Sequence, residues 1–305
     1  MELIKCFKAL SDKTRLRLLY VLQQYELNVN EIVLVVDMIQ SGVSRHLKIL
    51  MESGLLTSRK DGSFIYYSAV KNDVVKTFIS LINQSFETKD SILSRDLQKA
   101  REMIKIRQNR TRRFFKTVAP QWDRLKKEVL GRFDLNFMIK EKLSFQGNIT
   151  DLGCGTGELI EMLSQKASHK LIGIDASPEM LEQARLRLSG TVGAELRLGE
   201  LEHLPMKNKE IDTAIMNMVL HHIPQPELSV FEVFRVLKPK GQFILADFEK
   251  HDQEKIKQII GGSWLGFEKE KIKIWLADAG FCFKAVDSYP VNHGLTINVF
   301  TAIKP

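Results

Sequence analysis

Near the middle of the 305-residue chain, the stretch DLGCGTGE (residues 151–158) has residue types and spacing suited to holding a ligand. It follows a short apolar run and precedes the helix-like ELIEML, which predicts a turn between a strand and a helix. Gly153 and Gly155 let the backbone approach a ligand closely, and Gly157 allows close packing of the helix. Dinucleotide-dependent enzymes use a similar turn, so the motif alone does not choose the ligand.

Three polar residues further along the chain narrow that choice. Asp175 ends a second strand-like run, LIGI, where a carboxylate can accept hydrogen bonds from both hydroxyls of a ribose. Glu200 ends a third such run, and Asn217 lies on a fourth. A helix and a fifth strand follow in VFRVLKPKGQFILADF, so the second half of the chain alternates strands with helices, as in a parallel sheet covered by helices.

From about Phe114 to Pro305 this series resembles the class I S-adenosylmethionine-dependent methyltransferases, closest to the branch that methylates quinones and other small molecules. The resemblance implies S-adenosylmethionine or S-adenosylhomocysteine as the ligand. Asp151 and the glycines would hold its methionine end, Asp175 its ribose, and Glu200 with the Leu201 backbone its adenine. Aromatic Phe115 and Trp122 would cover it. The expected binding residues are Trp122, Asp151, Gly153, Cys154, Gly155, Gly157, Asp175, Ala176, Met180, Glu200, Leu201 and Asn217.

Catalytic residues are harder to identify, because a sulfonium already activates its methyl group and alignment supplies much of the rate. A general base helps only a poor nucleophile. His221 and His222, after the fourth strand, are the candidates for a base; otherwise they pack or are solvated. The three cysteines, Cys6, Cys154 and Cys282, are scattered, which indicates neither a disulfide framework, nor a zinc cluster, nor a thiol site for arsenite.

The N-terminal part has a different pattern. Helix-like stretches at Thr14–Gln24, Val29–Met38 and Val43–Glu52 precede LLTSRKDGSFIYYSA, in which two strand-like runs flank an Asp-Gly pair, a strong hairpin signal. Another helix-like stretch covers Val74–Phe86. Helices followed by a hairpin in this order describe a winged helix, whose recognition helix fits the major groove of DNA.

Three stretches in order, FKALSDKTRLRLL, VSRHLKILMESGLL and DGSFIYYS, resemble the arsenic-repressor (ArsR) type of winged-helix regulator over about residues 3–85. The resemblance implies a recognition helix from about Gln40 to Met51. We expect a dimer on an inverted repeat of double-stranded DNA, with helices Leu3–Leu10 and Val74–Phe86 at the interface. The candidate DNA contacts are Gln40, Ser41, Ser44, Arg45, His46, Arg59 and Lys60, the last two on the phosphate backbone; His46 could instead bond locally.

Two departures from that family concern the helix start and the effector. Ile39 and Gly42 stand where relatives use Ser or Thr, so the recognition helix lacks a capping side chain. Metal-sensing relatives place paired cysteines where this chain reads ELNVNEI, and Asn28 and Asn30 are poor ligands for a soft metal. We therefore expect no metal site, and the regulatory signal must come from elsewhere.

The net charge of +8 is unevenly distributed. Residues 89–142 carry 16 Lys and Arg against 7 Asp and Glu, whereas residues 143–305 carry 18 against 21. The basic stretch from about Asp90 to Lys116 reads as one long helix; it suits a polyanion partner, or is simply a solvated face. No run of about 18 apolar residues and no signal-peptide-like start is present, so we expect a cytoplasmic protein.

The sequence thus predicts a winged helix-turn-helix domain (α+β) over residues 1–88, a basic helical connector over residues 89–122, and an α/β Rossmann-like methyltransferase domain with a seven-stranded, mostly parallel sheet over residues 123–305. Two functions fit. The sequence favours a transcriptional regulator, a repressor, that senses an S-adenosyl ligand, because ligand residues are present but no substrate residues are identifiable. The alternative is an active small-molecule methyltransferase fused to its own DNA-binding domain.

Overall fold

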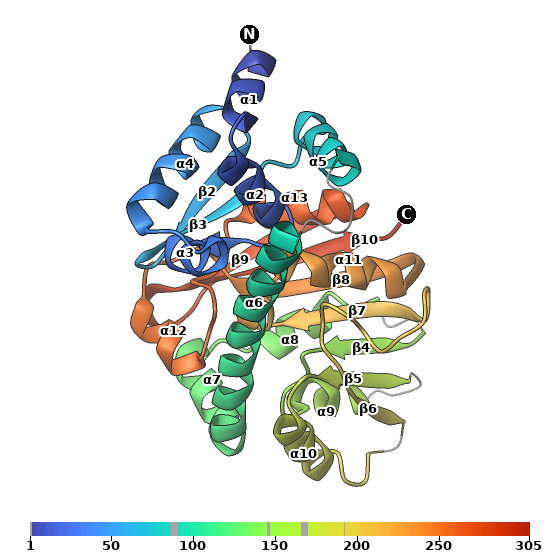
Figure 1. The fold of residues 1–305 in the computed structure, drawn as a ribbon. Helices are drawn as coiled ribbons and strands as arrows, with labels where there is room; N and C mark the ends of the chain where they lie inside the picture. Colours follow the sequence, from blue (N-terminus) through green and yellow to red (C-terminus); the bar gives the residue numbers. More distant parts are fainter. Residues whose placement is uncertain (1, 86–90, 145–146, 166–169, 192) are drawn as a thin grey trace. The chain divides into compact units, whose positions relative to one another are not determined.

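The computed structural model describes residues 2–85, 91–144, 147–165, 170–191 and 193–305 (Figure 1). The chain divides into two compact units, residues 1–107 and 108–305. The boundary expected between residues 88 and 89 lies outside the described residues, as do Phe86 and Asp90 at the ends of two expected helices. The long helix α6 (Ser91–Val118) contains the division between the units, so it contributes residues to both.

The first unit consists of helices around a small antiparallel sheet, which confirms the predicted winged helix. Its strands pair in the order β1-β3-β2. Its elements are α1 (Glu2–Leu10), α2 (Lys13–Leu22), β1 (Leu27–Asn28), α3 (Val29–Val36), α4 (Gln40–Glu52), β2 (Leu56–Asp61), β3 (Phe64–Ala69), α5 (Asp73–Ser85) and the first part of α6.

Local signals account for several of these boundaries. Asp12 caps α2, because its carboxylate accepts the backbone N–H of Arg15. Asn28 and Glu31 form a capping box at the start of α3. Helix α4 has Ile39 at its N-cap and therefore no capping side-chain bond, as its sequence predicts. Gly62 has a positive φ of 60° in the short turn between β2 and β3, a conformation that costs glycine little.

The first part of α6 is fixed to the first unit by an apolar stripe and by ion pairs. Leu93, Ala100 and Ile104 are buried in the core of that unit. The fully buried Asp96 carboxylate accepts two hydrogen bonds from Arg17, at 2.6 and 3.0 Å. Arg107 is paired with Glu31. Buried, hydrogen-bonded pairs of this kind fix orientation more reliably than exposed ones.

The second unit is built on a seven-stranded sheet with the order β6-β5-β4-β7-β8-β10-β9. The first five of these pair in parallel, and β10 and β9 run antiparallel at one edge, so the predicted Rossmann-like methyltransferase sheet is confirmed. The strands are β4 (Ile149–Leu152), β5 (Leu171–Asp175), β6 (Ala194–Leu198), β7 (Ile211–Asn217), β8 (Leu237–Phe248), β9 (Cys282–Pro290) and β10 (Thr296–Ile303).

Helices cover this sheet. Because crossovers between parallel strands are right-handed, α9 and α10 lie on one face and α11 lies on the other. The helices of the unit are the end of α6, α7 (Trp122–Leu130), α8 (Leu135–Glu141), α9 (Glu158–Ser164), α10 (Pro178–Arg187), α11 (Pro226–Val236), α12 (Glu254–Ile260) and α13 (Lys269–Ala279), with short turns η1 (Ala119–Gln121), η2 (Leu220–His222) and η3 (Asn292–Gly294). None of the helices in the described ranges is both long and apolar enough to cross a membrane.

Candidate functional site

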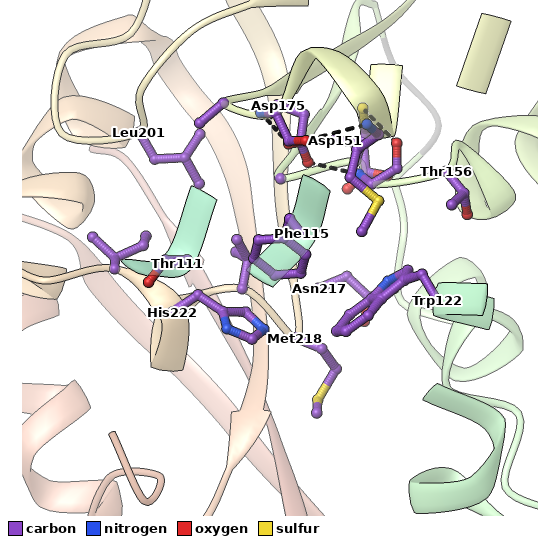
Figure 2. Close-up of a pocket in the computed structure, with 18 of the residues that line it drawn as sticks. Thr111, Phe115, Trp122, Asp151, Thr156, Asp175, Leu201, Asn217, Met218 and His222 are labelled. Carbon is purple, nitrogen blue, oxygen red and sulfur yellow. Dashed lines mark hydrogen bonds between the residues drawn. The ribbon is translucent and has the colours of Figure 1, made fainter. Parts of the chain in front are cut away.

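The strand order reverses between β4 and β7, and a pocket lies where these strands end (Figure 2). Open α/β sheets bind their ligands at such a switch point, because loops leaving neighbouring strands diverge there. The cavity volume is about 110 Å³, and its lining comes wholly from the second unit. Eleven of the twelve expected ligand residues line it: Trp122, Asp151, Gly153, Cys154, Gly155, Asp175, Ala176, Met180, Glu200, Leu201 and Asn217.

Gly157 is the expected ligand residue that does not line the pocket. It precedes α9 in the left-handed region, at φ 80°, and a Cβ there would lie 3.2 Å from the Cβ of Ala184 on α10. Its role is close packing between helices. Gly153 has φ 79°, and its Cβ would lie 2.3 Å from a methyl carbon of Val219, so the loop after β4 can meet the loop after β7 only with glycine at this position.

Asp175, at the end of β5, orients the glycine loop as well as facing the pocket. Its two carboxylate oxygens accept the backbone N–H groups of Gly155, at 2.9 Å, and Ser177, at 2.8 Å. Burial raises the pKa of Asp175 to about 6, against these two hydrogen bonds, and the nearby Glu200 carboxylate adds to the rise. Glu200 itself lies two residues beyond the end of β6, in a bridge with His203, rather than on the strand.

Asp151 and Asn217 bring two buried acceptor oxygens to the pocket. Within the described part of the chain, neither Asp151 Oδ1 nor Asn217 Oδ1 has a hydrogen-bond partner. Asn217 is held from its other side, where its Nδ2 donates to Asn136 Oδ1 at 2.8 Å. Burial raises the pKa of Asp151 to about 7, opposed by the Lys126 ammonium. Buried acceptors without donors are costly, so this end of the pocket fits a ligand group that donates hydrogen bonds, above all a cation.

Helix α7 contributes Lys126, which is not among the ligand residues expected from the sequence. Lys126 lines the pocket and forms an ion pair with Glu158 at the start of α9. The helix is attached to the glycine loop through Asp123, whose carboxylate accepts the Thr156 hydroxyl at 2.6 Å and is paired with Arg187. Although burial opposes it, these two partners lower the pKa of Asp123. The sequence does indicate this position, because Lys126 follows Trp122 by four residues and therefore lies on the same face of the helix.

Phe115 and Trp122, the two aromatic residues expected over the ligand, both line the pocket. Phe115, on the last turns of α6, lies with its ring centroid 5.2 Å from Trp122 and 4.8 Å from His222, both edge-to-face (Figure 2). Gln108, Thr111 and Arg112 extend the pocket wall along α6. Arg112 is paired with Glu200, the carboxylate expected to meet adenine. The neighbouring Glu202 is buried, which raises its pKa to about 7.

Both candidate histidines are buried, so neither is solvated. His221 Nδ1 lies 2.8 Å from Asp247 Oδ1 at the end of β8, and His221 also lines a second, smaller cavity of about 10 Å³, room for roughly one water. His222 lines the main pocket, with Nδ1 3.4 Å from the carbonyl oxygen of Gly261. Burial, with His221 nearby, lowers the pKa of His222 well below its usual value, so its imidazole is neutral near pH 7.

The cysteines have no geometry for chemistry at this site. Cys154 is buried in the glycine loop, and burial raises the pKa of its thiol, so the thiol stays protonated. Cys6 is buried in the first unit, and Cys282 is exposed on β9. Across the described ranges, no group of three or more His, Cys, Asp or Glu side chains is arranged to hold a metal ion.

The candidate DNA contacts divide into exposed and engaged residues. Gln40, Ser41, Ser44 and Arg45 are exposed along α4, and Lys60 is exposed on β2. His46 is half-buried, with Nδ1 3.7 Å from Asp12 Oδ1. Arg59 donates two hydrogen bonds to Glu26, at 2.8 and 2.9 Å, and lies 3.5 Å from the buried Asp61, so its charge is largely compensated within the unit. The geometry therefore favours Arg45 and Lys60 over His46 and Arg59.

Comparison with known proteins matches a segment of each unit to a family model. Residues 12–58 match the family model "Bacterial regulatory protein, arsR family", and residues 150–245 match the model "Methyltransferase domain". A SAM-dependent methyltransferase from Aquifex aeolicus superposes with a TM-score of 0.51 at 19% identity, over 62% of this chain and 98% of that one, which shows a shared fold.

Two curated relatives match parts of the chain. An uncharacterized 37.1 kDa protein of transposon TN4556 from Streptomyces fradiae is 38% identical over 99 residues, 32% of this chain and 29% of that protein. A demethylmenaquinone methyltransferase from Lactiplantibacillus plantarum is 30% identical over 154 residues, 48% of this chain and 65% of that protein. The chain thus spans less than two thirds of either relative. It carries an N-terminal arsR-family helix-turn-helix domain and a C-terminal class I methyltransferase domain, and the latter implies binding of S-adenosylmethionine or S-adenosylhomocysteine.

Proposed function

We propose that this chain, which joins an arsR-family DNA-binding domain to a class I methyltransferase domain, is an S-adenosylmethionine-dependent methyltransferase for a small molecule. The observation that supports it best is a neutral, buried imidazole, His222, in the pocket that also holds the unpartnered oxygens of Asp151 and Asn217. The relative from Lactiplantibacillus plantarum, a demethylmenaquinone methyltransferase, favours methyl transfer over the ligand sensing that the sequence alone favours.

The pocket residues suit the parts of an S-adenosyl ligand. The ammonium of its methionine end supplies the donors that Asp151 Oδ1 and Asn217 Oδ1 lack. Asp175, held by two backbone N–H groups, keeps lone pairs for the ribose hydroxyls. Glu200 and Leu201, after β6, are left for adenine, which requires Glu200 to part from Arg112.

Bound S-adenosylmethionine supplies an electrophilic methyl group on a sulfonium. The protein's share is to align the acceptor, exclude water and accept a proton. The packed rings of Phe115 and Trp122 exclude water from the pocket. With its Nδ1–H directed at the Gly261 carbonyl, His222 has a lone pair on Nε2, for which the described residues provide no partner. That nitrogen takes the acceptor's proton.

The pocket lining indicates the class of acceptor. Around His222, Met218, Ile223 and Pro224 are apolar, and the Phe115 ring packs edge-to-face with the imidazole. A small, largely apolar molecule with one ionisable O–H or C–H group matches this surface. The Asp247–His221 pair lies directly behind, with the two histidine rings 4.0 Å apart, and it fixes the orientation of the loop that carries His222.

The test is formation of S-adenosylhomocysteine, measured by mass spectrometry, with a panel of phenols, naphthoquinols and thiols as acceptors. Wild type is compared with His222→Phe, which keeps an aromatic ring but no base. A base contributes about 10²- to 10⁴-fold, so His222→Phe should lower turnover by that factor while binding of S-adenosylhomocysteine persists. Product formation by wild type no faster than by His222→Phe would refute transfer through this residue.

Ligand sensing is the second candidate, because one uninterrupted helix contributes to both units. Ala100 and Ile104 of α6 belong to the core of the first unit, whereas Thr111, Arg112 and Phe115 of the same helix line the pocket. A ligand that parts Arg112 from Glu200 changes the surroundings of that helix. Coupling requires a difference in ligand affinity between states that bind DNA differently, typically about 1–3 kcal/mol.

The same proposal gives the first unit a homodimeric, DNA-binding role. Large apolar side chains are exposed on α1 (Leu3, Ile4 and Phe7) and on α5 (Val74 and Leu81). The two helices form one surface, since the Phe7 and Phe78 rings meet edge-to-face at 5.2 Å. A two-fold dimer through this surface, with one α4 in each of two successive major grooves, requires an inverted-repeat operator.

Fluorescence anisotropy with a labelled operator, found first by selection from random duplexes, tests this role. Arg45→Ala should weaken binding by about 1–3 kcal/mol if Arg45 reads a base, and Lys60→Ala should weaken it uniformly across sequences. Arg59→Ala should lower the stability of the unit more than DNA affinity, since Arg59 is engaged with Glu26. Equal and negligible effects of Arg45→Ala and Lys60→Ala on DNA binding would contradict the assignment.

A further inference from the structure

The methionine end of the pocket contains a cation as well as the two acceptor oxygens. Among the described residues that line the pocket, the two Lys or Arg side chains are Arg112 and Lys126. Arg112 is engaged with Glu200, which follows β6, two strands away from Asp151 at the end of β4 in the sheet order. Leu201, next to Glu200, and Trp122 lie at opposite sides of the pocket (Figure 2). Lys126, one turn after Trp122, therefore belongs to the Asp151 end.

An amino-acid group has two charges, and each needs a partner when water is removed. Asp151 and Asn217 suit the ammonium, but beside the carboxylate of a ligand they would be repulsive or neutral. An uncompensated buried carboxylate costs several kcal/mol, so a cation must stand nearby. The Lys126 side chain is 18% exposed and already lies close enough to act on the charge of Asp151.

We propose that Lys126 binds the carboxylate of the methionine end and makes the pocket selective for S-adenosyl ligands that carry both amino-acid charges. The inference rests on the proposed function in taking the ligand to be an S-adenosyl compound. The Lys126 ammonium is paired with the carboxylate of Glu158, whose side chain is 43% exposed. The Glu158 side chain can therefore rotate into the solvent when the carboxylate of the ligand replaces it beside Lys126, and this movement costs little free energy.

The position of Lys126 is set by contacts on the same helix. Asp123, one turn earlier on α7, accepts a hydrogen bond from Thr156 of the glycine loop and is paired with Arg187 of α10. These contacts fix α7 against the loop that holds the ligand. Lys127, the next residue, is exposed and does not line the pocket, so it offers the same charge on the same helix without the contact.

The test is calorimetric titration with S-adenosylmethionine and with decarboxylated S-adenosylmethionine, which differ only in the carboxylate. Lys126→Met keeps the apolar stem of the side chain. It should lower the affinity for S-adenosylmethionine by about 10- to 100-fold, the effect of a lost charge-assisted hydrogen bond. The same substitution should change the affinity for decarboxylated S-adenosylmethionine by no more than about twofold. Lys126→Arg should restore most of the affinity, and Lys127→Met, the matched control, should leave both affinities unchanged.

Glu158→Gln supplies a test of opposite sign. This substitution removes the carboxylate that pairs with the Lys126 ammonium. The affinity for S-adenosylmethionine should therefore rise, and the affinity for the decarboxylated ligand should stay unchanged. Equal weakening of both ligands by Lys126→Met, or no tightening with Glu158→Gln, would overturn the inference. 5′-Methylthioadenosine, which lacks the whole amino-acid group, separates the two failures. If wild type binds neither it nor S-adenosylmethionine, the proposed function itself is wrong.

Discussion

The affinity for S-adenosylmethionine should fall steeply as pH falls, because the pocket presents a carboxylate whose pKa lies close to neutral. Burial raises the pKa of Asp151 to about 7 in the free protein. A ligand ammonium beside its unpartnered Oδ1 favours the ionised form. Binding therefore requires loss of a proton below pH 7, and protonation competes with the ligand.

The magnitude follows from the ionised fractions. Between about pH 7.5 and about pH 5.5, a carboxyl with a pKa of about 7 goes from roughly three quarters ionised to roughly 3%, a ~25-fold loss. Asp175, with a pKa of about 6, adds a ~4-fold loss through the ribose contact. S-adenosylmethionine should thus lose about 100-fold in affinity. The ligand's own α-amino group stays mostly protonated over this range.

5′-Methylthioadenosine provides the internal control, since it has the ribose but no ammonium. Its affinity should fall only about 4-fold over the same range, through Asp175 alone. Calorimetry in two buffers of different ionisation enthalpy should show release of roughly one and a half protons when S-adenosylmethionine binds near pH 6, about one from Asp151 and about half from Asp175. In Asp151→Asn, the pH dependence of S-adenosylmethionine binding should become that of 5′-methylthioadenosine. Parallel pH profiles of the two ligands in wild type would refute the reasoning.

Four further outcomes are expected. Asp175→Ala should weaken binding of the S-adenosyl ligand by about 1.5–3 kcal/mol by calorimetry, and unchanged affinity would exclude the ribose role. A carboxyl whose pKa is raised on folding stabilises the fold below its unfolded pKa and loses that contribution as pH rises through its folded value. Asp151→Asn should therefore raise the free energy of unfolding at about pH 8 by up to about 4 kcal/mol, and show no gain at about pH 4, in denaturant titrations of the two proteins. Phe7→Glu should give a monomer in sedimentation and lose cooperative operator binding; a persistent dimer would place the interface elsewhere. Trp122→Ala should reduce the shift in operator midpoint that saturating S-adenosylmethionine or S-adenosylhomocysteine causes, more than it changes DNA binding by ligand-free protein; a midpoint that neither ligand moves by about twofold in wild type would exclude sensing.

The sequence by itself determined the backbone conformation at particular glycines and the order of strands and helices along the chain. Gly153 and Gly155 stand where the backbone requires positive φ, and a positive φ is a property of one residue and its neighbours. The alternation of strands and helices after Ile149 determines a parallel sheet, and that topology alone brings the ends of β4, β5 and β7 together. Eleven of twelve expected ligand residues line the pocket for this reason.

The partners of charged side chains were decided by tertiary structure alone. Arg59 is engaged with Glu26, 33 residues away, so a hairpin arginine that reads as a DNA contact is largely neutralised. His221 meets Asp247 across 26 residues, and Lys126 meets Glu158 across 32. Such pairs leave no mark in local periodicity, because a charge can pair with any opposite charge that packing brings within about 4 Å. Gly157 illustrates the same point, since the sequence predicts close packing there and only the tertiary structure shows that the packing partner is Ala184 of α10.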